Sequence, residues 1–320
     1  MLKIGLLGAS KIAPTAVIGP AAKSDAFTIT AVAARDPARA RAYAEAHGIG
    51  GVADDYAALV RRDDVDIIYN GLPPAGHAEW TIAALEAGKT VLCEKPFARN
   101  AEAAAAMVAA AERTGQILLE AFHYRHHVVM RRALEIVASG VLGRISGAEA
   151  HFNVAIPNTP GELRWSAEQG GGGLMDLGCY PLHALRTLIG AEPKVLGASG
   201  VFVGGVDAEI SADLRFARDI EAKVSCSMTT PQPSAALTLT GTRGTLTIVN
   251  FLAPQGGCRF TVTIDGVTTA EPTEGPTSYE AQLENLRAVL LDGETPVTGG
   301  ADAIGNMTAI DAIYRAAGRA

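Results

Sequence analysis

Residues 1–120 alternate short apolar runs with longer segments of helical character, and this alternation limits the fold more than any other feature. The apolar runs lie at Leu2–Leu7, Thr28–Ala33, Asp66–Tyr69, Thr90–Cys93 and Gln116–Glu120. The helix-like segments lie near residues 11–23, 37–47, 55–62, 75–87 and 100–114. Strands that alternate with helices of this length form βαβ units with parallel strands. The pattern therefore predicts an N-terminal α/β domain with a doubly wound parallel sheet.

The ends of these segments carry residues that begin or stop helices. Asp36 precedes Pro37, which places a side chain able to cap a helix before a residue suited to its first position. Asn100 has the same place before the segment at 100–114. Gly48 and Gly115 follow two of the predicted helix ends, where a left-handed backbone is common.

The pattern changes after residue 121. Helices are predicted near residues 127–139, 176–189, 277–292 and 301–317. Strands are predicted at 144–156, 194–203, 208–216, 219–228, 235–240, 244–250 and 259–264. A run of strands with few helices between them indicates a large, mostly antiparallel open sheet in an α+β domain. We predict a domain boundary between residues 121 and 122.

Composition argues against several classes of partner. The formal net charge is −7 and no block of Lys and Arg occurs, which disfavours nucleic acid and anionic membranes. No stretch of the length and apolarity of a membrane span is seen, and the first residues do not resemble a signal peptide. The four cysteines form no CxxC pair, so we expect no metal site and a cytoplasmic location.

The first apolar run ends in a glycine turn that opens a helix-like segment. A turn in this position lets backbone amides and the helix N-terminus face a pyrophosphate. Gly8 and Ala13 fit the first and third positions of GxGxxG/A, and Ser10 replaces the second glycine. The alternative is an ordinary βα turn. The predicted cofactor contacts here are Gly8, Ala9, Ser10, Lys11 and Ile12.

The second apolar run ends in Ala34, Arg35 and Asp36. An NAD site usually has an acidic residue here for the ribose hydroxyls. Ala34 leaves space and Arg35 supplies a cation, which suits the 2′-phosphate of NADP. Asp36 could bond the ribose or cap the next helix. We predict NADP as the cofactor, with NAD as the alternative.

Several motifs together resemble one protein family. They are Glu94–Pro96 (EKP), Asn70–His77 (NGLPPAGH), Gly171–Tyr180 (GGGLMDLGCY), Glu120–Arg125 and the Gly8–Ala13 turn. The combination resembles the glucose–fructose oxidoreductase, inositol dehydrogenase and rhizopine catabolism (Gfo/Idh/MocA) family over nearly the whole chain. Within that family the sequence looks most similar to sugar oxidoreductases and dimeric dihydrodiol dehydrogenases.

The resemblance implies that Lys95 is catalytic. Hydride transfer at a carbonyl carbon develops negative charge on the oxygen, and a fixed ammonium lowers that barrier. The alternative is a surface lysine after a strand. Tyr180 stands where many relatives have histidine, and a neighbouring ammonium favours the charged form of a phenol. Tyr180 is therefore a candidate general acid/base, or else a packed core tyrosine.

Further candidates surround these two residues. His183 could supplement or replace Tyr180, or be a structural histidine. Asp176 could bind substrate hydroxyls, orient Lys95 or cap a helix. The resemblance places the following residues near the cofactor or the pocket wall: Asn70, Leu72, Pro73, His77, Glu94, His123, Arg125 and Trp165. Helix packing is the alternative for Trp165, and we expect His126 and His127 on a helix surface.

Together with these residues, the resemblance implies an NAD(P)-dependent oxidoreductase acting on a sugar, polyol or related alcohol or ketone. Residues 1–121 would be its dinucleotide-binding Rossmann domain, and residues 122–320 a domain for substrate binding and oligomerisation. Two alternatives share the fold: a non-catalytic dinucleotide-binding regulator, and a glycosidase that uses NAD. An open sheet is expected to expose an apolar face, and such faces tend to find a partner. We therefore expect a homodimer, or a tetramer, formed through the C-terminal sheet.

Overall fold

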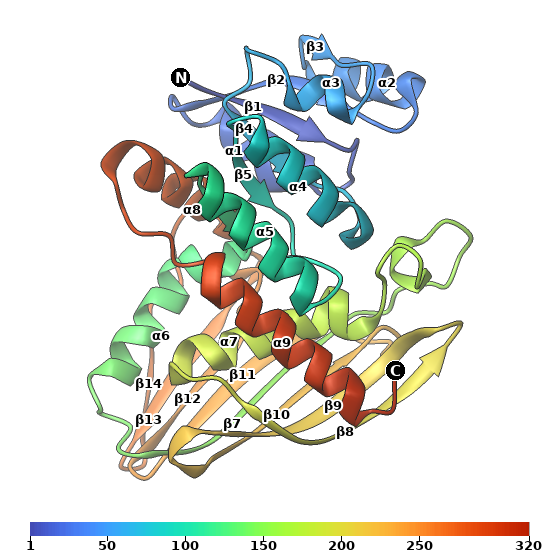
Figure 1. Cartoon of the computed structure of the whole chain (residues 1–320). Coiled ribbons are helices and arrows are strands. Elements are labelled where there is room, and N and C mark those ends of the chain that lie inside the picture. Colours follow the sequence, from blue (N-terminus) through green and yellow to red (C-terminus); the bar gives the residue numbers. More distant parts are fainter. Residues whose placement is uncertain (320) are drawn as a thin grey trace. The chain divides into compact units, whose positions relative to one another are not determined.

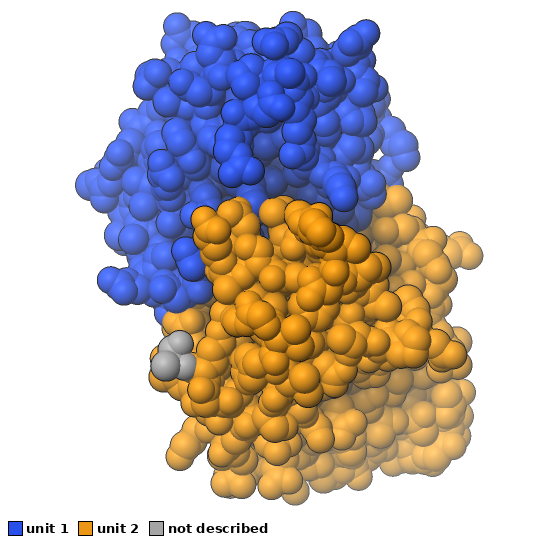
Figure 2. All heavy atoms as spheres, turned by 90° about the vertical axis from the view of Figure 1, so that its right-hand side faces the viewer, with its two compact units in different colours: residues 1–122, 279–304 blue, residues 123–278, 305–320 orange. Residues whose placement is uncertain are grey.

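A computed structural model describes residues 1–319 and divides them into two compact units (Figure 2). The first comprises residues 1–122 and 279–304, and the second comprises residues 123–278 and 305–320. The chain thus returns to the first unit after completing most of the second. Within residues 1–319, every helix is too short or too polar to cross a bilayer.

The first unit is built on a parallel sheet with the strand order β3-β2-β1-β4-β5-β6. Its strands are β1 (Leu2–Leu7), β2 (Phe27–Ala33), β3 (Gly51–Val52), β4 (Ile67–Asn70), β5 (Thr90–Cys93) and β6 (Leu118–Glu120). The order reverses between β1 and β4, and ligands of such sheets bind at the carboxyl ends beside this point. The predicted doubly wound parallel sheet is confirmed, although the two-residue β3 gave no sequence signal.

Helical segments connect these strands. They are η1 (Pro14–Ile18), α1 (Gly19–Ala22), α2 (Pro37–His47), α3 (Tyr56–Val60), η2 (Pro74–Gly76), α4 (His77–Glu86) and α5 (Ala101–Thr114). Asp36 caps α2 by accepting the Ala38 amide hydrogen at 2.8 Å, and Asn100 caps α5 in the same way. Gly48 and Gly115 adopt left-handed φ angles of 66° and 67° after these helices. The predicted ends of α2 and α5 are confirmed, whereas α3 is shorter than the predicted segment near 55–62.

The returning segment completes the core of the first unit. It forms α8 (Ser278–Arg287) and η8 (Ala288–Asp292). Leu283, Leu286 and Val289 belong to the same buried cluster as Val17 and Ile67. Helix packing therefore joins residues more than two hundred positions apart. The hydrophobic periodicity of α8 does not by itself predict which residues the helix packs against.

The second unit is built on a larger sheet with the order β14-β13-β12-β11-β7-β10-β9-β8. Its strands are β7 (Ile145–Asn153), β8 (Lys194–Val203), β9 (Val206–Phe216), β10 (Ile220–Ser227), β11 (Ser234–Gly241), β12 (Gly244–Val249), β13 (Arg259–Ile264) and β14 (Val267–Ala270). β7 and β10 pair in parallel, and the other neighbours are antiparallel. The predicted mostly antiparallel sheet is confirmed.

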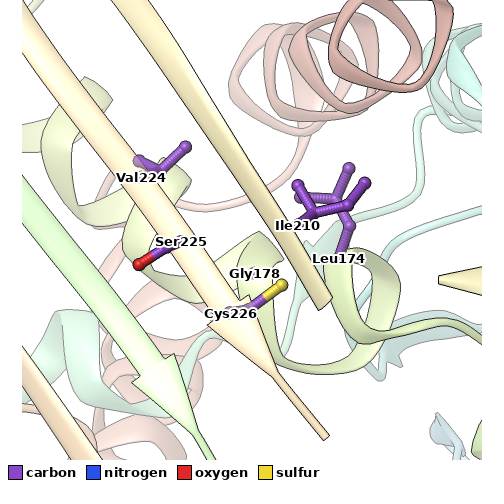
Figure 3. Close-up of a pocket in the computed structure, with 6 residues that line it drawn as sticks. All are labelled: Leu174, Gly178, Ile210, Val224, Ser225 and Cys226. Carbon is purple, nitrogen blue, oxygen red and sulfur yellow. The ribbon is translucent and has the colours of Figure 1, made fainter. Parts of the chain in front are cut away.

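The helices of the second unit cover one face of this sheet (Figure 1). The helical segments of this unit include η3 (His123–His126), α6 (Val128–Ala138), η4 (Leu163–Trp165), η5 (Leu174–Gly178), α7 (Cys179–Ile189) and most of α9 (Gly300–Ala316). Of these, α7 and η5 lie directly against the central strands. Gly178 allows η5 to approach β10, because a Cβ there would lie 2.9 Å from Sγ of Cys226 and 2.8 Å from Cδ1 of Leu174 (Figure 3).

The opposite face of this sheet is polar, so the predicted apolar face is wrong. Strand alternation turns the apolar side chains toward the helices and leaves threonines and charges on the other side. Thr238 and Thr247 pair across β11 and β12 at 3.2 Å. Large apolar side chains are exposed instead near the end of the edge strand β8, where Val201 is 54% exposed and Phe202 39%.

Candidate active site

The turn after β1 requires glycine at position 8. Gly8 has a φ of +92°, and its amide donates to the carbonyl oxygen of Ala33 at 2.9 Å. A Cβ at this position would lie 3.1 Å from Cδ2 of Leu72. The turn therefore lies against the loop that follows β4, at the carboxyl edge of the parallel sheet.

The residues after Gly8 form a compact start to a helix. Oγ of Ser10 accepts the Ala13 amide hydrogen at 3.3 Å, so the hydroxyl caps the turn. Ala13 is fully buried, as expected for a residue that lets helix and strand pack closely. Lys11 and Ile12 are exposed, and Ala9 is buried. This small-residue turn at a helix N-terminus has the backbone shape that suits a pyrophosphate.

Two residues of α2 hold this turn in place. Nη2 of Arg39 donates to the Ala9 carbonyl oxygen at 2.7 Å, and Oη of Tyr43 donates to that of Ser10 at 2.9 Å. Ala34 is buried, and Arg35 is exposed one turn before Arg39. Sequence reasoning selected Arg35, which precedes α2, and missed Arg39 in the first turn of that helix.

The loop after β4 is fixed by buried polar side chains. Asn70 donates to the carbonyl oxygen of His77 at 3.2 Å and to Oγ1 of Thr81 at 3.1 Å, and its own oxygen accepts from Leu72 N. Nδ1 and Nε2 of His77 lie 2.9 and 2.7 Å from the carbonyl oxygens of Pro96 and Leu72. Asn70 and His77 therefore brace the loop that contains Leu72 and Pro73.

Charged and phenolic groups meet after β5. Oε1 of Glu94 accepts the hydroxyl hydrogen of Tyr69 at 2.8 Å, and burial, together with this carboxylate, raises the pKa of Tyr69. Burial raises the pKa of Tyr279 to about 12, with Glu94 adding to the rise and Lys95 opposing it. Lys95 is half-buried. Tyr279, from α8, therefore lies within electrostatic reach of Lys95, and no sequence signal indicated it.

In the second unit, Tyr180 lies in a cluster of rings. It is 7% exposed, and its hydroxyl lies 3.4 Å from Nε2 of His123. The ring of Tyr180 makes edge contacts with His123, Tyr124 and Phe152, with ring centroids about 6 Å apart. Two predicted residues, Tyr180 and His123, are therefore brought together.

Three further histidines, whose places were predicted from the sequence, are buried in the structure. His183 is buried, and its Nδ1 lies 2.5 Å from the hydroxyl of Tyr124. His126 and His127 are 7% and 1% exposed, so their predicted place on a helix surface is wrong. His127 caps α6 through its Nδ1, and His126 lies close enough to His183 for their charges to interact.

Asp176 forms an ion pair within the second unit. Its Oδ2 accepts from Nε of Arg164 at 2.6 Å, and Arg164 also pairs with Glu162. The alternative that Asp176 caps its helix is wrong, because the helix begins earlier and Asp207 accepts the Leu174 amide hydrogen at 2.6 Å.

Two further predicted residues, Trp165 and Arg125, lie in the second unit. Trp165 donates from Nε1 to the carbonyl oxygen of Ile156 at 2.9 Å, which ties the loop after β7 to η4. Arg125 is half-buried in η3. In residues 1–319 no three His, Cys, Asp or Glu side chains are grouped so as to hold a metal ion.

Comparison with known proteins identifies the family of this chain. The family model described as "Oxidoreductase family, NAD-binding Rossmann fold" matches residues 2–122, and the GFO/IDH/MocA C-terminal domain matches residues 130–247. The chain is 33% identical to D-xylose 1-dehydrogenase (NADP(+)) 2 from Haloferax volcanii over 99% of this chain and 97% of the relative. It is also 33% identical to trans-1,2-dihydrobenzene-1,2-diol dehydrogenase from Sus scrofa over 69% of this chain and 66% of the relative.

A solved structure agrees with the sequence comparisons. The aldose-aldose oxidoreductase from Caulobacter crescentus, complexed with glycerol, superposes with a TM-score of 0.90 at 28% identity. The match covers 99% of this chain and 97% of that structure. Both kinds of relative that the sequence resembles, sugar oxidoreductases and dihydrodiol dehydrogenases, are therefore found. The chain belongs to the GFO/IDH/MocA family of oxidoreductases, and its first domain is that family's NAD-binding Rossmann domain.

Proposed function

We propose that this protein is an NADP-dependent oxidoreductase that transfers hydride between the nicotinamide and a sugar, polyol or related alcohol or ketone. The observation that carries the proposal is the placement of Lys95. It follows β5 at the carboxyl edge of the parallel sheet, which also carries the Gly8 turn. Ligands of this fold bind beyond that edge. The named dehydrogenases among the relatives favour this function over a regulator or an NAD-dependent glycosidase.

The residues of the first unit fit NADP. The Gly8–Ala13 turn would hold the pyrophosphate, and the guanidinium groups of Arg35 and Arg39 would meet the 2′-phosphate. The relative from Haloferax volcanii is named as NADP-dependent, which supports this choice over NAD. His77, Asn70 and Glu94 would shape the region beside the nicotinamide. When bound, the nicotinamide supplies or accepts the hydride.

The chain's own residues would manage charge and protons. The ammonium of Lys95 would stabilise the negative charge that develops on the substrate oxygen. Tyr180 would move the proton to or from that oxygen. Lys95 lies two residues after the end of β5, and His123 lies three residues after the end of β6, the neighbouring strand. His183 would position the ring cluster through Tyr124.

We infer a neutral polyhydroxylated substrate. The ion pair of Asp176 with Arg164 offers both acceptors and donors for hydroxyl groups, and Glu162 adds a second carboxylate to it. One guanidinium thus faces two carboxylates, which does not favour an anionic substrate. Trp165 and Arg125 would form part of the pocket wall. Glycerol in the Caulobacter crescentus structure is a polyol of the same chemical class.

The test is turnover of a substrate panel by wild type and by Lys95→Met. The panel comprises D-xylose, D-glucose, glycerol and a trans-dihydrodiol, each with NADP⁺ and NAD⁺. We expect Lys95→Met to lower kcat by about 100- to 1000-fold, the size seen when a fixed donor to a developing oxyanion is removed. NADPH should still bind. Lys3→Met, at an exposed position on β1, is the matched control. Full turnover by Lys95→Met would refute the assigned role.

We also propose that two copies pair through the uncovered face of the second unit's sheet. Charges of opposite sign alternate across that face, since Lys223 on β10 pairs in register with Glu149 on one side and Asp213 on the other. A two-fold interface needs such a self-complementary surface. A tetramer would be a dimer of such dimers. Sedimentation velocity at micromolar concentration should show a dimer or a tetramer. Thr247→Arg, on the proposed interface, should weaken the association of the two copies. A purely monomeric boundary for wild type would contradict the proposal.

We also propose a cytoplasmic location, which the state of the cysteines supports. No disulfide forms within residues 1–319, and burial raises the pKa of the Cys93 and Cys226 thiols well above its usual value. Such thiols are stable in a reducing compartment. Cell fractionation should recover the protein with cytoplasmic markers.

A further inference from the structure

Tyr180 begins a chain of hydrogen bonds that ends at an exposed side chain. Its hydroxyl lies 3.4 Å from Nε2 of His123. Nδ1 of His123 lies 2.9 Å from Oγ of Ser278. The Ser278 hydroxyl in turn donates to Oε1 of Gln255 at 3.4 Å. Tyr180, His123 and Ser278 are 7%, 6% and 0% exposed, whereas Gln255 is exposed.

The direction of these bonds can be assigned from the end of the chain. The backbone amide of Ser278 also points at Oε1 of Gln255, at 3.3 Å. A backbone N–H can only donate, so the oxygen of the Gln255 amide faces Ser278. The Ser278 hydroxyl therefore donates its hydrogen to Gln255, and the lone pairs of the Ser278 oxygen accept a hydrogen bond from Nδ1 of His123. Nδ1 carries the hydrogen of the neutral imidazole.

This assignment leaves Nε2 of His123 with a lone pair facing Tyr180. The Tyr180 hydroxyl then donates to the imidazole instead of accepting from it. The edge contacts of Tyr180 with His123 and Phe152 hold the rings in place, with interplanar angles of 68° and 80°. The acceptor is therefore positioned before any substrate binds.

We propose that His123 is the proton acceptor for Tyr180, a positioning residue that acts through the tyrosine. This inference rests on the proposed function. During alcohol oxidation the C–H bond of the substrate carbon would break, with its hydride passing to NADP⁺. The substrate O–H bond breaks as well, and its proton passes to the Tyr180 oxygen as the Tyr180 O–H proton passes to Nε2. The imidazole becomes a cation with hydrogens on both nitrogens, and the proton then leaves to water. In carbonyl reduction the same transfers run in reverse.

The tautomer of His123 provides a test that needs no turnover. Long-range ¹H–¹⁵N correlation spectra distinguish a protonated ring nitrogen from an unprotonated one, and the His123→Gln spectrum assigns the signal. We expect the Nδ1–H form in wild type. Ser278→Ala removes the acceptor at Nδ1 and should shift His123 toward the Nε2–H form. An Nε2–H form in wild type would overturn the proposal.

Kinetics provide the second test, with the sugar that the panel shows to be turned over best. Glutamine can accept a hydrogen bond near the Nε2 position but cannot take a proton. His123→Gln should therefore lower kcat about 10- to 100-fold, the range of general acid–base effects. KM and the Kd for NADPH should stay within about 3-fold, because substrate and cofactor binding are retained. His47→Gln, on α2 of the first unit, is the matched control.

The outcomes separate this inference from the proposed function. Wild-type kcat in His123→Gln, with Tyr180→Phe inactive, would overturn the role of His123 and support the oxidoreductase. An Nδ1–H tautomer without turnover of any panel member would refute the oxidoreductase proposal and support the hydrogen-bonded chain itself. A selective loss of kcat in both His123→Gln and Ser278→Ala would support both.

Discussion

Nδ1 of His77 lies 2.9 Å from the carbonyl oxygen of Pro96. The other ring nitrogen lies 2.7 Å from the carbonyl oxygen of Leu72, so one buried imidazole joins the loop after β4 to the loop after β5. Burial lowers the pKa of His77, while the carbonyl contacts oppose that change. The loop after β5 carries Lys95, and His77 therefore helps to fix the backbone from which the ammonium extends.

Replacing His77 should impair catalysis without direct loss of a reacting group. His77→Leu removes both contacts, and we expect kcat to fall about 10-fold or more, because small misplacements of a catalytic group are costly. In His77→Gln, where the side chain can keep one contact, kcat should fall less. Steady-state kinetics with NADPH measure both, and His47→Gln on α2 is the control. Equal kcat in His77→Leu and wild type would contradict the bracing role.

Arg39 should govern the choice of cofactor. Its guanidinium donates to the Ala9 carbonyl oxygen within the turn that is proposed to hold the pyrophosphate, and Arg35 lies just before the start of the same helix. Arg39→Ala should weaken NADPH binding by about 10- to 100-fold, since a charge-assisted contact of roughly 1.5 to 3 kcal/mol is lost. NADH binding should change much less. Fluorescence titration measures both, with Arg41→Ala as the exposed control on α2. Equal losses for both cofactors would contradict the assignment.

The first unit was largely predictable because its signals are local. Gly8, Asp36 and Asn100 act through the backbone within a few residues of themselves, so each can be read from its immediate neighbours. Apolar runs bounded by such residues leave few alternatives to a parallel sheet. Lys95 and Tyr180 could be selected only because their motifs resemble a known family.

The parts of the fold and of the candidate site that were not predicted depend on contacts between residues far apart in sequence. Tyr279 returns to the surroundings of Glu94 from α8, and Ser278 reaches His123 across a long stretch of chain. No local pattern names such partners. The polarity of the uncovered sheet face was misjudged for a different reason: the alternating threonines of β11 and β12 were visible, but which face the helices cover is set by tertiary packing.

Acid should destabilise the protein through His126. Burial, with the nearby Arg125 and His183, lowers the pKa of His126 from 6.5 to about 3. The unfolded chain therefore binds a proton that the folded chain does not, and stability falls as the pH drops through 6.5 toward 3. Between pH 6.5 and about 5 this amounts to about 2 kcal/mol.

The pH dependence can be isolated with a variant. His126→Gln removes the titrating group, so its urea midpoint should change less between about pH 7 and about pH 5 than the wild-type midpoint does. His47→Gln should behave like wild type. The same loss of stability in His126→Gln as in wild type, over the same pH interval, would rule out His126 as the source.

Asp207 fixes the Gly-rich segment that leads to Asp176 and Tyr180. Its carboxylate is fully buried and accepts from Leu174 N at 2.6 Å and from the Tyr314 hydroxyl at 2.7 Å. Gly172 lies directly against it, with a φ of +130°, and a Cβ there would collide with Oδ1 of Asp207. The glycine is therefore required both by its backbone conformation and by the carboxylate that occupies the space.

Gly172→Ala should therefore lower the free energy of unfolding more than a glycine substitution that only strains the backbone. Gly161 is the matched position, because its φ is +84° and a Cβ there would meet nothing within 4 Å. We expect Gly161→Ala to lose about 1 kcal/mol in the free energy of unfolding and Gly172→Ala about 2 kcal/mol more, since the added methyl displaces a buried hydrogen-bond acceptor. Tyr314→Phe, which leaves Oδ1 of Asp207 without that donor, should lose about 1 to 3 kcal/mol. Urea unfolding measures all three, and equal losses for Gly172→Ala and Gly161→Ala would show that Asp207 does not hold this segment.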